Sequence, residues 1–156
     1  MDAHGRARMV DVSEKPSTSR VALARAVVEL TPEILNVLMD GKLPKGEGLA
    51  AARLAGIQAA KETSRLIPLC HPLSLSAVEI DLQPCGEDSV EITALVRCQG
   101  PTGVEMEAMT AASVAALTLY DMCKALHRGI RILRIELVHK AGGRSGEWNR
   151  SDEDAQ

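Results

Sequence analysis

The chain has 156 residues, 46% of them hydrophobic, and a formal net charge of −3 at pH 7. This length and apolar content predict a single folded domain with a substantial core and argue against disorder. The slightly negative charge argues against general nucleic-acid binding, and one Trp, one Tyr and no Phe argue against a site that stacks bases between aromatic rings.

No apolar run reaches the length of a membrane span, and the N-terminal residues show no secretory-signal pattern, so we expect a cytoplasmic protein. The cysteines are Cys70, Cys85, Cys98 and Cys123, and none of them form a Cys-x-x-Cys pair. In a reducing compartment we therefore expect free thiols. Their spacing does not suit zinc, and we predict no metal site.

The first 19 residues predict a flexible arm, in which the segment MVDVSEK (residues 9–15) is the part we expect to become ordered. Residues 20–29 alternate weakly between apolar and polar and predict a strand. Thr31, Pro32 and Glu33 are typical of a helix start, with Thr as the N-cap and Pro at the first helical position. This helix should end at Asp40-Gly41.

The loop LPKGEG (residues 43–48) precedes a second predicted helix over residues 47–65, which must end before Pro68. Pro68 and Pro72 bracket a stiff, irregular link. A strand follows over residues 73–83, and its apolar residues change parity near residues 76–77, which predicts a β-bulge. A turn over residues 84–88 then leads to a strand over residues 90–98, so the two strands should form a hairpin.

The most apolar stretch predicts a long helix from about Met106 that stops at Gly129. A last strand over residues 130–139 is followed by a loop, AGGRSGEW, and a disordered acidic tail over residues 149–156. If the short first helix is set aside, the order is strand, helix, strand, strand, helix, strand. This order predicts a ferredoxin-like α+β fold, an antiparallel sheet covered by helices on one face, formed by residues 20–148.

Charged residues stand at both ends of the long helix. Glu105 and Glu107 lie at its start, where an extended link would place both on one face, and Asp121 and Lys124 lie one turn apart near its finish. A rise of about 1.5 Å per residue separates Glu107 from Asp121 by about 20 Å. One small ligand can hardly span both ends within one chain. Either the clusters belong to different sites, or two chains complete one site.

Each pair at the helix ends has two interpretations. Asp121 and Lys124 fit an exposed ion pair, or a proton-transfer pair in which burial lowers the pKa of the lysine. Glu105 and Glu107 fit acids that favour a helix N-terminus, or carboxylates that orient basic groups of a ligand.

The loops add further candidates. Cys70 and His71 fit a buried thiol beside a hydrogen-bonded histidine, a Cys/His nucleophilic pair, or a histidine that donates to a ligand. Lys45 comes where free backbone N–H groups open a helix, a combination that suits an anion, and the GGRSG stretch could also contact phosphate. Together these groups predict cofactor-free acid–base chemistry on an anionic small molecule.

Several long motifs resemble those of the MoaC family: MVDVSEK, KGEG followed by ARLAGIQAAK, LIPLCHPL, TGVEMEAMTAASVAALTLYDMCKAL and KAGGRSGEW. The resemblance runs from about Met9 to Trp148. It implies a ferredoxin-like subunit assembled as a hexamer, a trimer of dimers, with its site at a dimer interface. It also implies a lyase of molybdenum cofactor biosynthesis that converts 3',8-cyclo-7,8-dihydro-GTP, made by a radical-SAM partner enzyme, into cyclic pyranopterin monophosphate and pyrophosphate.

The resemblance carries roles onto particular residues. The catalytic residues that it implies are Asp121, Lys124 and Lys45. The substrate-binding residues that it implies, of which the last two would face the triphosphate, are Leu69, Cys70, His71, Glu105, Met106, Glu107, Arg20 and Lys140. No cofactor is implied. Two other functions compete with this one: a non-catalytic nucleotide-binding scaffold, and a hydrolase that uses Cys70 as its nucleophile.

Overall fold

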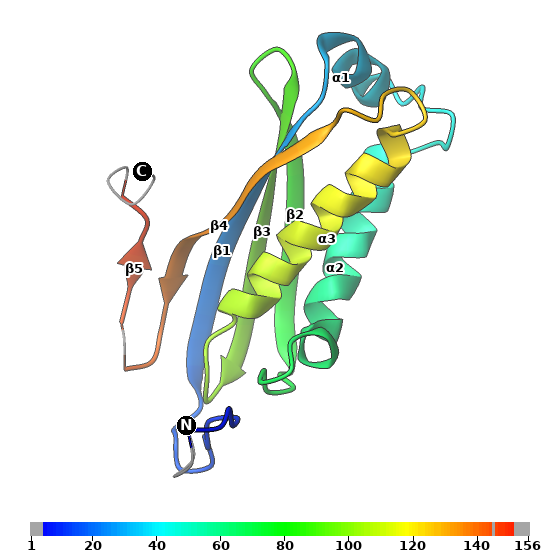
Figure 1. Cartoon of the computed structure of the whole chain (residues 1–156). Helices are drawn as coiled ribbons and strands as arrows, with labels where there is room; N and C mark the ends of the chain where they lie inside the picture. The colour runs from blue at the N-terminus through cyan, green and yellow to red at the C-terminus, as the bar shows by residue number, and fades with distance from the viewer. Residues whose placement is uncertain (1–4, 145, 152–156) are drawn as a thin grey trace.

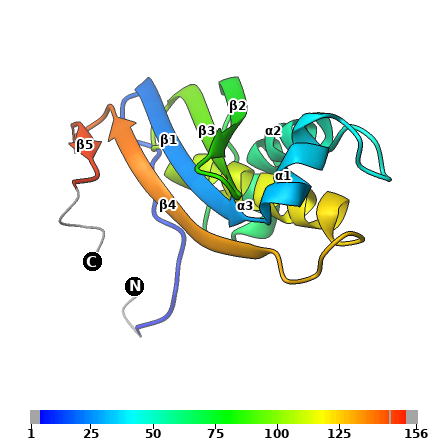
Figure 2. The same cartoon turned by 90° about the horizontal axis from the view of Figure 1, so that it is seen from above.

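A computed structural model describes residues 5–144 and 146–151 and contains an antiparallel sheet with its long helices on one face (Figure 1). The elements are β1 (Thr18–Glu29), α1 (Pro32–Met39), α2 (Gly48–Leu66), β2 (Leu75–Cys85), β3 (Ser89–Gly100), α3 (Glu105–Cys123), β4 (Arg131–Ala141) and β5 (Trp148–Asn149). The sheet order is β2-β3-β1-β4-β5. The predicted ferredoxin-like α+β plan is confirmed, and Figure 2 shows α2 and α3 as one layer against the sheet.

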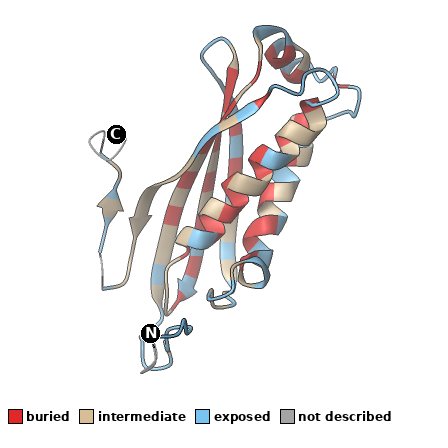
Figure 3. Ribbon diagram, viewed as in Figure 1, coloured by how far each residue is buried: buried red, intermediate tan, exposed pale blue. Residues whose placement is uncertain are grey.

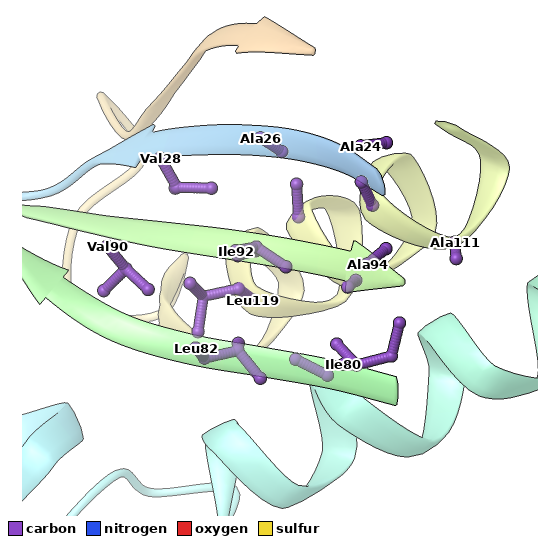
Figure 4. Close-up of a cluster of buried hydrophobic side chains, with 14 of the residues drawn as sticks. Ala24, Ala26, Val28, Ile80, Leu82, Val90, Ile92, Ala94, Ala111 and Leu119 are labelled. Atoms are coloured by element: carbon purple, nitrogen blue, oxygen red, sulfur yellow. The ribbon is translucent and has the colours of Figure 1, made fainter. Parts of the chain in front are cut away.

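The inner face of the sheet is made by every second residue of its two central strands. On β1, Ala24 and Ala26 are fully buried, and they lie opposite Ala94 and Ile92 of β3. Side chains at alternating positions of a strand share one face, so this face turns toward the helices as a continuous apolar surface. Figure 3 shows the buried bands on both strands, and Figure 4 shows how Leu119 of α3 reaches the same cluster.

Small residues let the two long helices approach each other closely. A Cβ built on Gly56 of α2 would lie 3.1 Å from the backbone oxygen of Ala111 and 3.3 Å from the Cβ of Ala115, both on α3. On α3 itself a row of fully buried alanines faces this contact and the sheet: Ala108, Ala111, Ala112, Ala115 and Ala116. The helix layer is therefore close-packed, with little room for larger side chains.

Both ends of α3 differ from the sequence prediction. The helix ends at Cys123 and not at Gly129, because the following residues are exposed and form turns, one of them closed by a bond from the N–H of Leu126 to the carbonyl oxygen of Cys123. It begins at Glu105, so the predicted extended link is wrong. Glu105 and Glu107 lie on the first helical turn, where two residues are about 200° apart around the axis, so they do not share a helix face, although both line one cavity at this end of the helix.

The edges of the sheet show three further outcomes. The predicted β-bulge is confirmed, because the register of β2 shifts between Leu75 and Ala77. β2 also continues through Pro84. Proline has no backbone N–H, and an edge strand tolerates it because no strand lies on its outer side to accept a hydrogen bond. β5 joins the last residue of the predicted loop, Trp148, to the first residue of the predicted disordered tail, Asn149. Trp148 pairs with Lys140 and Asn149 with His139, and two residues are too few to give a periodic signal.

Parts of two predicted segments lie outside the described residues: 1–4 of the arm and 152–156 of the acidic tail. Within the described ranges, none of the helices combines the length and the hydropathy that a bilayer-spanning segment requires.

The close contact between α2 and α3 predicts a strong penalty for added volume. We expect Ala115→Leu to lower the free energy of unfolding by about 2–3 kcal/mol, because the close contact with Gly56 of α2 leaves little space for the added atoms. Urea unfolding followed by circular dichroism measures this. Ala125→Leu is the matched control, since Ala125 is exposed in the turn after α3 and should change stability by less than about 0.5 kcal/mol. Equal effects of the two substitutions would contradict the tight contact.

Candidate functional site

The predicted site residues gather in two groups, one at each end of α3. Figure 1 shows the end of α3 beside the loop that enters α2, and its start beside the end of β3. Along the helix axis, Glu107 and Asp121 are separated by about 20 Å, as the rise of the helix requires. We call the first group the lysine end of α3; it contains Lys45, Asp121 and Lys124. We call the second group the cavity end; it contains the predicted residues near the start of the helix, among them Glu105 and Glu107.

At the lysine end, one carboxylate binds two ammonium groups. Asp121 Oδ1 lies 2.6 Å from Lys124 Nζ, and Asp121 Oδ2 lies 2.7 Å from Lys45 Nζ. Lys45 Nζ also donates to the backbone oxygen of Asp121 at 3.0 Å. Lys124 follows Asp121 by three residues, so the turn of the helix brings the two together, whereas Lys45 is delivered by the loop before α2.

The charges at the lysine end reinforce one another. Hydrogen bonds from Lys124 and Lys45 hold the pKa of Asp121 down to about 2. The hydrogen bond and charge of Asp121 raise the pKa of Lys124. The interpretation that burial lowers the pKa of this lysine is therefore wrong for the chain by itself, because about half of the Lys124 side chain is exposed. As it stands, Lys124 is a cation and a proton donor.

At the cavity end, an open cavity of about 260 Å³ is lined by most of the predicted binding residues. Those residues are Leu69, Cys70, His71, Glu105, Met106 and Glu107. Glu107 is only 4% exposed, and burial raises its pKa, with a smaller contribution from the charge of Glu105. A carboxyl group in this setting can both donate and accept hydrogen bonds near neutral pH more readily than an exposed one.

The loop residues Cys70 and His71 differ in what they can do. Burial, and then the charge of Glu107, raise the pKa of the Cys70 thiol, which disfavours the thiolate that a nucleophilic cysteine needs. His71 Nε2 lies 2.8 Å from the backbone oxygen of Val10 and must be the donor, because a carbonyl oxygen only accepts. The MVDVSEK segment, to which Val10 belongs, is therefore docked beside this cavity.

A second cavity of about 540 Å³ adjoins the first and carries several cationic groups. Arg20 and Lys140, the residues expected to face a triphosphate, both line it, and Lys140 Nζ lies 3.2 Å from Glu105 Oε1. Arg20 donates through Nε to the carbonyl oxygen of Gly100 at 3.3 Å, and so its guanidinium group is held against the end of β3. We call this the cation cavity. It shares Glu105, together with residues 102 and 103, with the smaller cavity.

Two residues of the cation cavity, Lys15 and Arg144, were not among the predicted binding residues. Their signal was present, because Lys15 ends the MVDVSEK motif and Arg144 lies in the GGRSG stretch. Among the residues that the structure describes, no group of three or more His, Cys, Asp or Glu side chains is arranged to hold a metal ion. The carboxyl, ammonium, guanidinium and imidazole groups that line the two ends of α3 can supply proton transfer and charge stabilisation.

Comparison with known proteins places these residues in a family context. The sequence profile described as the MoaC family matches residues 9–143. A protein of Thermomicrobium roseum named cyclic pyranopterin monophosphate synthase is 57% identical over 157 aligned positions, covering 100% of this chain and 95% of that protein. A protein of the same name from Chloroflexus aurantiacus is 58% identical, covering 96% of this chain and 93% of that protein.

The ion pairs at the lysine end fix the direction of its pH dependence. The pKa of Asp121 is lowered, so its contribution to stability is present above about pH 3.8, the ordinary value, and is lost as the pH falls through about 2. The pKa of Lys124 is raised, so its contribution is present below about pH 10.5 and is lost at higher pH.

We expect Asp121→Asn to lower the pKa of Lys124, because the substitution removes the hydrogen bond and the charge that raise it. NMR titration of the Lys124 side-chain ¹³Cε signal measures this pKa. Asp40→Asn is the matched control: Asp40 pairs with Lys42 on the surface, and its loss should leave the Lys124 titration unchanged. An unaltered Lys124 titration in Asp121→Asn would contradict the assigned contact.

Proposed function

The chain belongs to the MoaC family, and we propose that it acts as a cyclic pyranopterin monophosphate synthase. It would convert 3',8-cyclo-7,8-dihydro-GTP into cyclic pyranopterin monophosphate and release pyrophosphate, a lyase reaction of molybdenum cofactor biosynthesis. The observation that carries this proposal is the identity of 57–58% to proteins of that name, which extends over nearly the whole length of both chains. The reaction needs no group beyond acids, bases and cations, which is the chemistry that the described side chains offer.

At the lysine end, the proposed roles follow from the geometry. Lys124 donates protons and stabilises negative charge that develops during ring opening and phosphate cyclisation, and Lys45 does the same from the opposite side of Asp121. Asp121 fixes the positions of both ammonium groups. Before either lysine acts as a base it must lose a proton, and desolvation of Lys124 by a covering surface would favour that loss.

At the cavity end, the proposed roles are recognition. Glu105 and Glu107 accept hydrogen bonds from the N–H groups of the guanine-derived ring, and His71 contacts the ring or its sugar from the other wall of the smaller cavity. Arg20 and Lys140 hold the triphosphate and then the leaving pyrophosphate in the cation cavity. Leu69, Cys70 and Met106 supply the apolar part of the binding wall.

The separation of the two ends supports a site shared between two chains. A substrate that occupies the cavity end of one chain leaves the lysine end of that chain about 20 Å away. We therefore propose that the lysine end of a second copy covers the cavity end, at a dimer interface within a hexamer built as a trimer of dimers. The same proposal includes a cytoplasmic enzyme whose single domain is residues 20–148, with a radical-SAM enzyme as the source of its substrate.

The first test removes the proposed acid. We expect Lys124→Ala to fold normally and to lose at least about 10²-fold in turnover, because general acid–base groups contribute about 10² to 10⁴. Product formation from purified 3',8-cyclo-7,8-dihydro-GTP measures this. Lys42→Ala is the matched control, since Lys42 forms an exposed ion pair with Asp40 outside both cavities. Wild-type turnover in Lys124→Ala would exclude the proposed role.

The second test asks whether two chains share a site. Lys124→Ala and His71→Ala alter opposite ends of α3, so each should be inactive alone. After mixed refolding, a dimer with one chain of each kind has one site with both changes and one intact site. Random mixing should therefore restore about one quarter of wild-type activity. If mixed oligomers form and no activity returns, each site is contained within one chain and the shared site is wrong.

A further inference from the structure

The loop after β4 forms one wall of the cation cavity. Gly142, Gly143 and Arg144 all line this cavity. A Cβ built on Gly142 would lie 2.1 Å from the backbone oxygen of Ser19, and one built on Gly143 would lie 1.5 Å from Arg20 Nη1. Both glycines also have positive φ angles, 106° and 71°. The loop backbone is thus pressed against β1 in a conformation that other residues rarely adopt.

The strand that follows this loop, β5, is too short to stabilise the loop by itself. β5 has two residues, and only Trp148 and Asn149 pair with β4. A two-residue pairing next to a glycine-rich loop gives little stability by itself. Within the described residues, the segment is also held by contacts of Asn149 and Glu147 with His139 of β4, and by several contacts of the next residue, Arg150.

Arg150 binds the base of the hairpin in several ways. Its backbone N–H donates to the carbonyl oxygen of Val138 at 2.8 Å, and its Nε donates to the carbonyl oxygen of Leu137, also at 2.8 Å. Its guanidinium carbon lies 5.6 Å from the centre of the Trp148 ring. Its Nε lies 3.7 Å from Glu136 Oε2. The residue that directly follows β5 therefore contacts three consecutive residues of β4, two of them through its side chain and one through its backbone.

Glu136, which Arg150 contacts, is itself held in place by other residues. The Glu136 side chain is 14% exposed and accepts a hydrogen bond of 2.9 Å from Arg25 Nε on β1, and Arg134 Nε lies 3.5 Å from it. Burial acts to raise the pKa of Glu136, but the hydrogen bond from Arg25 and the surrounding arginine charges outweigh it and hold the pKa below its usual value. The carboxylate is therefore ionised and held in place at neutral pH.

We propose that Arg150, which lines neither cavity, is a positioning residue that holds the loop of Gly142, Gly143 and Arg144 in the shape that binds the substrate's phosphates. This inference rests on the proposed function, in which the anion in the cation cavity is the triphosphate and then pyrophosphate. Without Arg150, the loop occupies its binding conformation for only a fraction of the time. The apparent affinity for the anion is then the intrinsic affinity multiplied by that fraction. Saturating substrate restores the loop, so turnover at saturation is preserved.

The experiment compares Arg150→Gln with Arg134→Gln. Both substitutions remove one positive charge near the Glu136 carboxylate, but Arg134 makes none of the contacts to β5 described here. We expect Arg150→Gln to raise the KM for 3',8-cyclo-7,8-dihydro-GTP and the Kd for inorganic pyrophosphate by about tenfold, which corresponds to a loop competent for one tenth of the time. We expect kcat to stay within about threefold, and Arg134→Gln to stay within about twofold of wild type on all three quantities.

Several results would overturn the positioning role. If Arg150→Gln and Arg134→Gln lose pyrophosphate affinity equally, the effect comes from charge alone. Full recovery of pyrophosphate affinity in Arg150→Lys would lead to the same conclusion, because lysine keeps the charge but not the guanidinium geometry. If hydrogen exchange at residues 142–144 becomes faster in Arg150→Gln while the Kd for pyrophosphate does not change, Arg150 stabilises the loop but does not position it for binding. Should Arg150→Gln not fold, Asn149→Ala removes the bond of 2.8 Å between Asn149 of β5 and His139 of β4, and should produce the same split between KM and kcat.

The pyrophosphate measurement separates this inference from the proposed function. If the wild-type protein forms product and Arg150→Gln binds pyrophosphate normally, only the role of Arg150 is wrong. If the wild-type protein forms no product but Arg150→Gln still weakens pyrophosphate binding about tenfold, the synthase assignment fails and the positioning role stands for whatever phosphate-bearing ligand the cavity takes.

Discussion

The close packing of α3 is the constraint from which the arrangement of the site follows. Its buried alanines meet the apolar face of the sheet on one side and the glycine of α2 on the other, at distances that leave no room for movement. Close packing of this kind resists bending and sliding of the helix. Its two charged ends lie about 20 Å apart along the axis, too far for one small molecule to contact both within one chain.

The two ends also differ in electrostatic character, as the proposed roles of proton transfer at one end and ligand recognition at the other require. At the lysine end the ions are half exposed and satisfy one another, which keeps Lys124 protonated. At the cavity end a carboxyl group, Glu107, is buried, and cationic side chains face an open space. The first arrangement consists of charges that neutralise one another and are open to solvent, whereas the second combines a buried carboxyl group with cations that line an open cavity. This difference is compatible with the proposal that the two ends come together from two copies.

Much of this structure was predictable from the sequence because its signals are local. The Thr31-Pro32 helix start and the change of parity on β2 gave correct elements, since capping and alternation depend on a few neighbouring residues. The pair formed by Asp121 and Lys124 follows from helical spacing. Lys45 was predicted from its loop as an anion-binding residue, and from the family motif as a catalytic one, but its contact with Asp121 was not predicted because it joins distant segments. The end of α3 was missed because the apolar pattern continues past Cys123 although no core remains to cover it. β5 was missed because two residues carry no periodic signal. The direction of the Lys124 pKa shift was missed although its cause, Asp121, lies only three residues away, because the exposure of Lys124 depends on the tertiary fold.

The scarcity of aromatic residues has a practical consequence for spectroscopy. The single Trp of the chain, Trp148, lies on β5 beside Arg150, and the single Tyr, Tyr120, lies on the last turns of α3, where its hydroxyl donates to the carbonyl oxygen of Arg128. Neither ring belongs to the fully buried core. Indole fluorescence therefore reports on the β4–β5 hairpin near the cation cavity, and phenol absorbance on the neighbourhood of the lysine end. The wild-type protein thus carries a separate optical probe near each end of α3 without any label.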